Sequence, residues 1–276
     1  MKIHISKQLP LMLLLGSTLA FTACQKEEDV QESIDVESAE ANAIADLEMA
    51  SVDEFVEDVI SAEPQLNGRV AAPESLPDCA TRTYNSDTRT VTIDFGTTNC
   101  LCRDGKSRRG KIVSKFEGRP HQEGSKVITT LVDYYVNDMR ITGTRTVTYV
   151  SRNKKNVVVL DASIATPGGT ITWRAERVIE RIAGGDTPQM TDDIYLLNSR
   201  AAGVNRRGVA YTSVTEQPLK RVLAVGCARH FVSGIILIKN ENGHTLRLNY
   251  DPTGGEPCDN IAEVTLNGRR TKIIRL

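Results

Sequence analysis

The sequence predicts an all-β protein with about eleven antiparallel strands in a curved sheet, a sandwich or a partly closed barrel, plus one short N-terminal helix. The composition, 40% hydrophobic and 25% charged, is typical of a globular chain. After Pro77, apolar residues alternate with polar ones, as at Val91, Ile93 and Phe95, and no run of 12 or more residues has helical periodicity. Strands without intervening helices favour antiparallel pairing, because parallel crossovers need long connections.

The first 23 residues have the pattern of a secretory signal. Lys2 and Lys7 form a positive start, residues 9–19 form an apolar core too short to span a bilayer, and small residues precede Cys24. The run Phe21-Thr-Ala-Cys24 resembles the lipobox of bacterial lipoproteins, with Phe21 where the motif usually carries an aliphatic residue. This resemblance implies that Cys24 becomes an acylated mature N-terminus. The alternative is a plain signal peptide that contains a cysteine.

The residues after Cys24 indicate where the chain would reside. Gln25 stands where inner-membrane retention uses Asp, so the outer membrane is favoured, and residues 26–29, Lys-Glu-Glu-Asp, are similar to a signal that exports some lipoproteins to the cell exterior. Two or more acyl chains anchor a protein stably. The resemblance therefore implies an outer-membrane lipoprotein that faces the cell exterior, with the membrane as its partner through Cys24.

Charge is unevenly distributed along the chain. Residues 25–63 contain fourteen acids and one base, a net charge of −13, whereas residues 64–276 carry +10. Residues 24–50 are expected to be an acidic tether. The capping-box pattern Ser51–Glu54 and helical spacing predict a short helix over about 52–61, within a helix and linker region 51–77. We expect this helix to cover one edge or end of the sheet; docking on another subunit, or on nothing, are the alternatives.

The β-rich domain, residues 78–276, contains two degenerate repeats, at about 79–112 and 227–273. Each begins with Cys-Ala, continues with a strand that ends in a glycine four residues before the next cysteine, and closes with a basic hairpin turn. The repeats predict a duplicated β-module with cysteine pairs in matching positions.

Five cysteines remain after the lipidated one. Thiols are oxidised beyond the inner membrane, so Cys79–Cys100 and Cys227–Cys258 are the expected disulfides. Cys102 is then left over, and it can replace Cys100 as the partner of Cys79. Metal ligation by Cys100-x-Cys102 is another alternative, although zinc sites usually have a second matching pair.

Two basic turns are candidates for anion binding. Arg108 and Arg109 occupy the first repeat, and Arg269 and Arg270 occupy the equivalent place in the second. If both turns point the same way, they form one rim for an acidic glycan or lipopolysaccharide. Charged turns also keep β-proteins soluble and protect sheet edges, which is the competing interpretation.

Residues 251–260 form the richest oxygen cluster. Asp251, Glu256 and Asp259 are candidates for a calcium site, because Ca²⁺ prefers six or more oxygen ligands and one turning loop can present several. The loop lacks the EF-hand pattern, and these residue types are also ordinary turn formers. No cofactor is expected.

The sequence favours a non-catalytic binding or structural role at the cell surface. It contains no Gly-x-Ser-x-Gly, His-Glu-x-x-His, P-loop or Gly-x-Gly-x-x-Gly motif, and no aromatic interleaving that would indicate nucleic-acid binding. One alternative is a carrier that holds an apolar ligand in the curved sheet. Another is a glycan-directed hydrolase with two facing carboxylates among Asp94, Asp133, Asp161 and Glu176.

Overall fold

A computed structural model describes residues 36–62, 76–187, 189, 191–225, 227, 231–259 and 261–275. The expected signal peptide, Cys24, the acidic stretch as far as residue 35 and most of the linker lie outside these residues. Within the described ranges, no helix combines the length and the apolar character needed to cross a bilayer.

The described residues form one helix and fourteen strands. These are α1 (Glu37–Ala62), β1 (Thr81–Asn85), β2 (Thr90–Asp94), β3 (Cys100–Leu101), β4 (Ser107–Glu117), β5 (Lys126–Val136), β6 (Met139–Ser151), β7 (Lys154–Thr166), β8 (Gly169–Ala183), β9 (Ile194–Val204), β10 (Ala210–Val222), β11 (Phe231–Asn240), β12 (Thr245–Asn249), β13 (Ile261–Leu266) and β14 (Arg270–Arg275).

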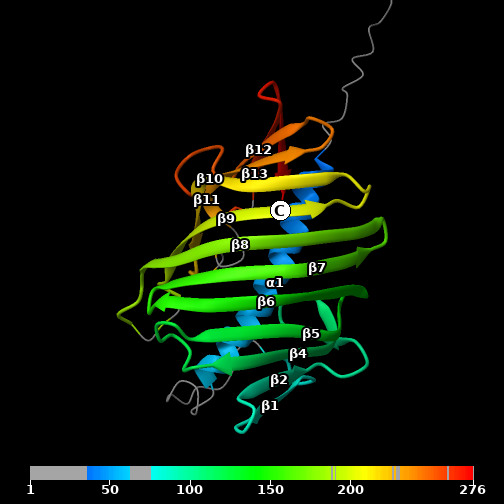
Figure 1. Cartoon of the computed structure of the whole chain (residues 1–276). Coiled ribbons are helices and arrows are strands. Elements are labelled where there is room, and N and C mark those ends of the chain that lie inside the picture. The colour runs from blue at the N-terminus through cyan, green and yellow to red at the C-terminus, as the bar shows by residue number, and fades with distance from the viewer. Residues whose placement is uncertain are drawn as a thin grey trace, which may run out of the picture. The chain divides into compact units, whose positions relative to one another are not determined.

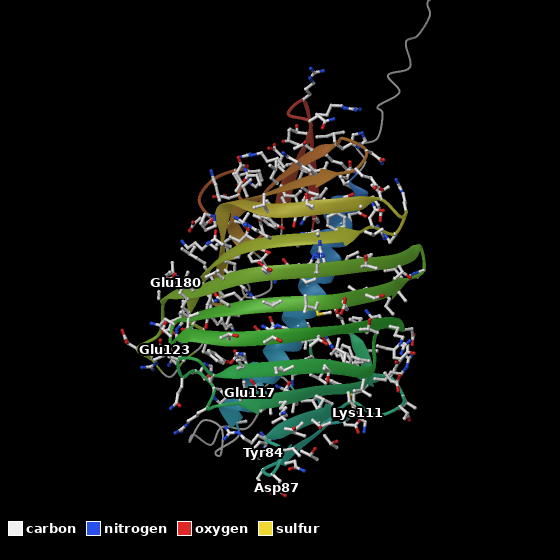
Figure 2. All side chains as sticks on the ribbon, viewed as in Figure 1. Tyr84, Asp87, Lys111, Glu117, Glu123 and Glu180 are labelled. Carbon is white, nitrogen blue, oxygen red and sulfur yellow. A yellow bond between two sulfur atoms is a disulfide. The ribbon has the colours of Figure 1, made fainter. Side chains whose placement is uncertain are left out.

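All fourteen strands belong to one antiparallel sheet, so the all-β prediction is confirmed. The order runs from β1 through β2 and β4 to β14, with β3 paired beside β4. Three short elements raise the number above eleven: β1, the two-residue β3, and the division of 261–275 into β13 and β14 by the Asn267-Gly268 turn. Among the described residues, β1 and β14 form the two edges, and Tyr84 and Asp87 mark the β1 edge in Figure 2.

Local sequence explains both the turns and the bends of the sheet. Asn137 and Asp138 join β5 to β6, and both have positive φ angles, 47° and 65°, as a two-residue type I′ turn requires. Gly110 interrupts the β4–β5 register at φ 87°, and a Cβ there would lie 1.9 Å from the carbonyl oxygen of Asp133. Such bulges increase the local twist and help a sheet to curve.

Helix α1 begins at Glu37, fifteen residues before the expected start near residue 52. Residues 37–50, which we expected to be part of the tether, are therefore helical. Ala39, Ala41, Ala45 and Met49 give this half of the helix a buried apolar face, although its overall hydrophobic content is low. Glutamates in the first turn also favour the helix N-terminus electrostatically.

The helix lies across a face of the sheet rather than on an edge or end. Figure 1 shows α1 behind the strands, and its apolar residues belong to the same buried core as those of the sheet. Only Glu40, Leu47 and Glu54 of α1 are exposed among the residues whose burial is described. They are seven residues apart, about two helical turns, so they form one narrow stripe. Most of the helix surface is therefore covered, and one stripe faces solvent.

The two expected disulfides are present. Cys79 pairs with Cys100 and Cys227 pairs with Cys258, while Cys102 is a buried free thiol. Because Cys100 is oxidised, a Cys100-x-Cys102 metal site is not formed.

The two repeats lie at opposite ends of the sheet, β1–β4 and β11–β14, and their pairing differs. In the first repeat β2 pairs directly with β4, whereas in the second β12 pairs with β13. The duplication therefore stays a prediction.

Candidate functional site

The densest group of charged side chains among the described residues lies between α1 and the face of the sheet that α1 covers, which we call the inner face. We call this group the α1 seam. Seven acids of α1 meet six basic residues of the sheet and its turns. The acids are Glu37, Glu40, Asp46, Glu48, Asp53, Glu54 and Glu57, and the bases are Lys106, Arg145, Lys155, Arg177, Arg206 and Arg221. Part of the acidic excess of residues 25–63 is thus paired with bases of the sheet region.

Asp53 occupies the centre of the seam. Its Oδ1 lies 2.7 Å from Arg145 Nη2 on β6, and its Oδ2 lies 3.3 Å from Lys155 Nζ on β7. Burial opposes ionisation of Asp53, but Arg145 and Lys155 outweigh it and hold the pKa of the carboxyl below its ordinary value. The pKa of Lys155 changes in the opposite direction. Burial lowers it, but Asp53 and Glu57 raise it by more, so the pKa of Lys155 lies above its ordinary value. The opposite charges at this centre therefore stabilise one another.

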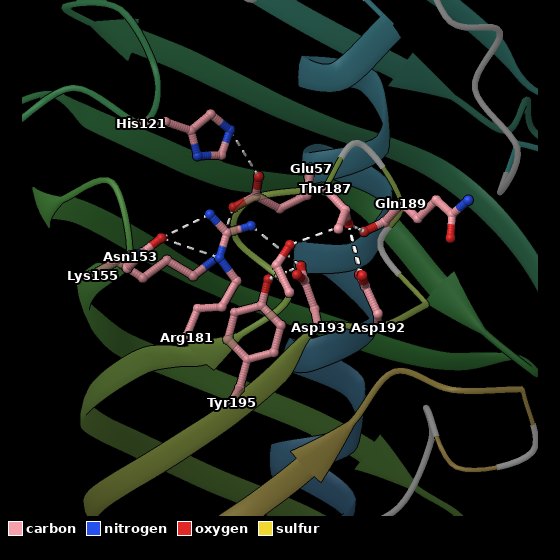
Figure 3. Close-up of polar contacts among 11 residues, drawn as sticks. Glu57, His121, Asn153, Lys155, Arg181, Thr187, Gln189, Asp192, Asp193 and Tyr195 are labelled. Atoms are coloured by element: carbon pink, nitrogen blue, oxygen red, sulfur yellow. Dashed lines mark hydrogen bonds and ion pairs between the residues drawn. The ribbon is translucent and has the colours of Figure 1, made fainter.

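Glu57 extends the cluster toward the C-terminal end of α1. Its Oε1 accepts hydrogen bonds from Lys155 Nζ at 2.7 Å and from the Tyr149 hydroxyl at 3.1 Å. Its Oε2 lies 3.5 Å from His121 Nε2 (Figure 3). Burial disfavours its charge, yet Lys155 and His121 bring the pKa of Glu57 below its ordinary value. A carboxylate that orients an imidazole can take part in proton transfer. Here the carboxylate already has three partners that attach α1 to the sheet.

A second polar group in Figure 3 ties the ends of β7, β8 and β9 together. Arg181 donates from Nη2 to Asn153 Oδ1 at 2.8 Å and from Nη1 to Asp193 Oδ2 at 3.4 Å. The Tyr195 hydroxyl donates to the same Asp193 oxygen at 2.8 Å. Burial, and then this bond to Asp193, raise the pKa of Tyr195. We interpret this group as structural, since Arg181 joins Asn153 to Asp193 and Asp193 joins Arg181 to Tyr195.

Two further ion pairs hold the first half of α1. Arg206, in the β9–β10 turn, contacts Glu37 at 2.6 Å and Glu40 at 2.7 Å. The hydrogen bond to Glu37 is the main reason that the pKa of Arg206 is raised. Asp46 pairs with Arg177 of β8, and this pair is more enclosed because both side chains are nearly buried.

The only tryptophan of the chain reports directly on the α1 seam. Trp173 Nε1 donates to Asn42 Oδ1 of α1 at 3.2 Å, and Ser213 of β10 donates to the same oxygen at 3.0 Å. The guanidinium of Arg177 lies 5.0 Å from the indole ring centre, within the range of a cation–π contact. Movement of α1 therefore changes the environment of this indole.

Arg108, which we proposed as an anion-binding residue, is completely buried. Its guanidinium donates to both carboxylate oxygens of Asp104, at 2.8 and 2.6 Å, to Ser51 Oγ at 2.8 Å and to the Tyr134 hydroxyl at 3.1 Å. It also lies over the Phe55 ring. Burial would lower the pKa of Arg108, but the bond to Asp104 and its other contacts raise it. The prediction was wrong for this residue, because its guanidinium is buried and engaged by Asp104, Ser51 and Tyr134.

The expected common anion-binding rim is not formed either. Arg108 and Arg109 begin β4, whereas Arg269 and Arg270 lie at the β13–β14 turn, nine strand steps away. At ~4.8 Å per step this is about 43 Å along the sheet. Arg109 itself pairs with Asp138 and stacks on the Tyr135 ring. A meander separates its two terminal repeats, so equivalent turns do not converge.

The calcium candidates have separate partners. Asp251 Oδ2 accepts a bond from the Glu256 amide at 3.2 Å, Glu256 pairs with Lys220, and Asp259 Oδ1 accepts from the Ile261 amide at 3.1 Å. Across the part of the chain that the structure describes, no group of three or more His, Cys, Asp or Glu side chains could hold a metal ion. The loop is therefore organised by capping contacts and one ion pair.

The four carboxylates considered for glycan hydrolysis lie on four different strands, and none is buried. Asp94 pairs with Lys111 at 2.9 Å, and this bond lowers the pKa of Asp94, which is opposite to what a general acid needs. Asp133, Asp161 and Glu176 are exposed.

A shallow cavity of about 640 Å³ lies over β7–β11. Its lining includes two bases, Arg174 and Lys239, and two acids, Asp161 and Glu241. Because acids and bases are equal in number in this lining, its charge favours neither an anionic nor a cationic ligand.

The fold and the α1 seam define an open antiparallel β-meander whose inner face is filled by its own acidic N-terminal helix. No family model, curated protein or solved structure matches the chain. Sequence reasoning missed Asp53 and Glu57 as site residues. The signal that could have found them is the excess of acids on one predicted helix opposite an excess of bases in the predicted sheet.

Proposed function

We propose that this chain is a lipid-anchored outer-membrane protein with a non-catalytic binding or structural role on the cell exterior. The observation that carries the proposal is the filled inner face: the place where a curved sheet would hold a ligand is occupied by α1. The body is therefore a scaffold whose inner face is already filled, and it follows shortly after the proposed anchor in the sequence. Cys24 and Val36 are twelve positions apart in the sequence, and at 3.3–3.6 Å per residue the chain between them spans at most about 43 Å.

The two disulfides support an oxidising location for the body. Disulfides persist outside the cytoplasm and are rare within it. Cys79–Cys100 and Cys227–Cys258 close the two terminal regions of the sheet, β1–β3 and the β11–β13 segment. This agrees with export through the proposed signal.

The carrier alternative is weaker, because the inner face is not simply apolar. If α1 left, the six bases of the α1 seam would lose their partners while the apolar lining became accessible. A lipid with one head group could pair with only one or two of these bases, and an unpaired buried charge is strongly destabilising. The charge pattern of the inner face fits an acidic helix better than an acyl chain.

An acidic glycan or lipopolysaccharide remains the proposed partner class. The contact would now use the β13–β14 turn, where Arg269 and Arg270 are exposed. Replacing both arginines with serine is expected to reduce retention on lipopolysaccharide or heparin. The same double change at Arg174 and Lys239 is the matched control, and equal loss from both variants would count against a specific contact at the turn.

The anchor is tested with the full-length chain in a Gram-negative host, using a clickable palmitate analogue and protease treatment of intact cells. Labelling and surface digestion are expected for the wild type and for Cys102→Ser, and loss of label is expected for Cys24→Ser. An unlabelled wild-type protein, or one with an uncleaved leader and reduced cysteines, would overturn the proposal.

A further inference from the structure

We propose that the inner face of the sheet accepts α1 from a second copy of this chain, so that two copies exchange helices and form a dimer. The site would be the α1 seam, completed by the acids of the partner copy. This inference goes beyond the proposed function and does not depend on acylation of Cys24.

The attachment of α1 permits such an exchange. The hydrogen bonds and ion pairs between α1 and the strands described above all join side chains, as for Asn42 with Trp173 and Asp53 with Arg145. Among the described residues, α1 and the strands share no backbone pairing, so their strand pairs can stay intact when the helix leaves. The cost of opening lies in the seam and in the apolar core beneath it, and an identical helix restores both.

The connection to the sheet is long enough. Eighteen residues separate Ala62, the end of α1, from Thr81, the start of β1. Fully extended they reach about 60 Å, whereas α1 with its 26 residues is about 39 Å long. The chain can thus place α1 on a neighbouring sheet without disturbing its own β1.

The chemistry of the inner face identifies the occupant. It requires a helix with a buried apolar face, such as Ala45, Val52 and Val59 provide, and with acids on both flanks, such as Glu48 and Asp53. A ligand that matches only one of these patterns leaves either apolar surface in contact with water or buried bases unpaired. The α1 helix of a second copy matches both, because domain swapping preserves each contact of the closed form.

Concentration decides between the closed and exchanged forms. A connection of this length gives the helix an effective concentration of about 1 mM at its own sheet. At ~10 µM protein the closed monomer is therefore favoured by about a hundredfold. The exchanged dimer becomes more populated when copies are refolded at high concentration or confined to a membrane surface.

Charge-reversed variants can favour the exchanged dimer over the closed monomer even at low concentration. Asp46 pairs with Arg177, and both are nearly buried, so one copy carries Asp46→Lys and the other carries Arg177→Glu. Each variant alone places like charges together in its closed form, at a cost of more than about a hundredfold in docking. In a mixture, the helix with the Asp46→Lys change meets the sheet with the Arg177→Glu change, and the remaining helix and sheet form the native pair.

Native mass spectrometry of a 1:1 mixture with distinct mass tags, refolded together at ~10 µM, is expected to show mainly the heterodimer, with recovery of Trp173 fluorescence. The matched control exchanges charges at Glu54–Arg221, the pair of the α1 seam in which 54% of the Glu54 side chain is exposed, and little heterodimer is expected there. The doubly substituted Asp46→Lys/Arg177→Glu chain should be a closed monomer. A mixture that contains only the separate monomers would overturn the proposal.

A wild-type experiment covers the case in which a single variant does not fold. Two wild-type copies with different tags are refolded together at ~1 mM and diluted immediately before measurement. Heterodimers at a fraction comparable with monomers are expected, because bulk and effective concentrations are then similar. Monomers alone would overturn the proposal regardless of how the variants behave.

Discussion

Replacing Asp53 by asparagine is expected to lower the free energy of unfolding by about 3 kcal/mol. The carboxylate contacts Arg145 at 2.7 Å and Lys155 at 3.3 Å, and the side chains of these bases are only 5% and 15% exposed. Removing one partner of a buried ion pair costs about 3–5 kcal/mol. The low end applies, because Asp53 itself is 19% exposed and Lys155 keeps Glu57 at 2.7 Å.

Urea unfolding followed by the fluorescence of Trp173 measures this change, since the indole is bonded to Asn42 of α1. Glu54→Gln is the matched control: it also removes one negative charge from α1, but 54% of the Glu54 side chain is exposed. Exposed pairs contribute 0–1 kcal/mol, so the control should lose less than about 1 kcal/mol. If the two variants lose the same stability, the reasoning that the α1 seam depends on buried charge pairs is wrong.

Two other outcomes follow from the pKa directions and the disulfides. The pKa values of Asp53 and Glu57 lie below the ordinary 3.8 and 4.5. The stability that these carboxylates contribute is therefore fully present above the ordinary values and is lost as the pH falls through the lower native ones. Unfolding measured as a function of acid pH should show this loss, and a flat profile below pH 4 would contradict it. Replacing Cys79 and Cys100 by serine should cost about 3 kcal/mol for a 21-residue separation, measured by thermal unfolding, whereas Cys102→Ser should cost clearly less, and equal costs would argue against the pairing.

The strands were predictable because their signal is local. Alternation of apolar and polar residues, as at Val91 and Ile93, is fixed by the two faces of a sheet whichever strands lie beside it. The two disulfides were likewise predictable, from the matching cysteine positions of the two repeats. The short β3 and β1 carried too few residues for a pattern.

The α1 seam was not predictable in the same way. The helix over residues 37–50 looked like a solvated tether because its apolar face is built largely from alanine, and only the sheet shows that its acids have partners. Arg108 looked like a turn residue for the same reason, since its contact with Ser51 joins residues 57 positions apart. Features that depend on such long-range pairing leave no periodic signal in the sequence.

The meander and the helix also differ in when they can assemble. Each main strand pairs with one close to it in the chain, so hairpins can form soon after synthesis. Helix α1 is made first, yet its partners lie as far as 171 residues downstream, at Ser213 on β10. A lone helix of this length is marginal in water, so its docking is expected to be the last step. Until β10 exists, the apolar lining of the sheet faces water, and the incomplete chain is then the form most prone to aggregation.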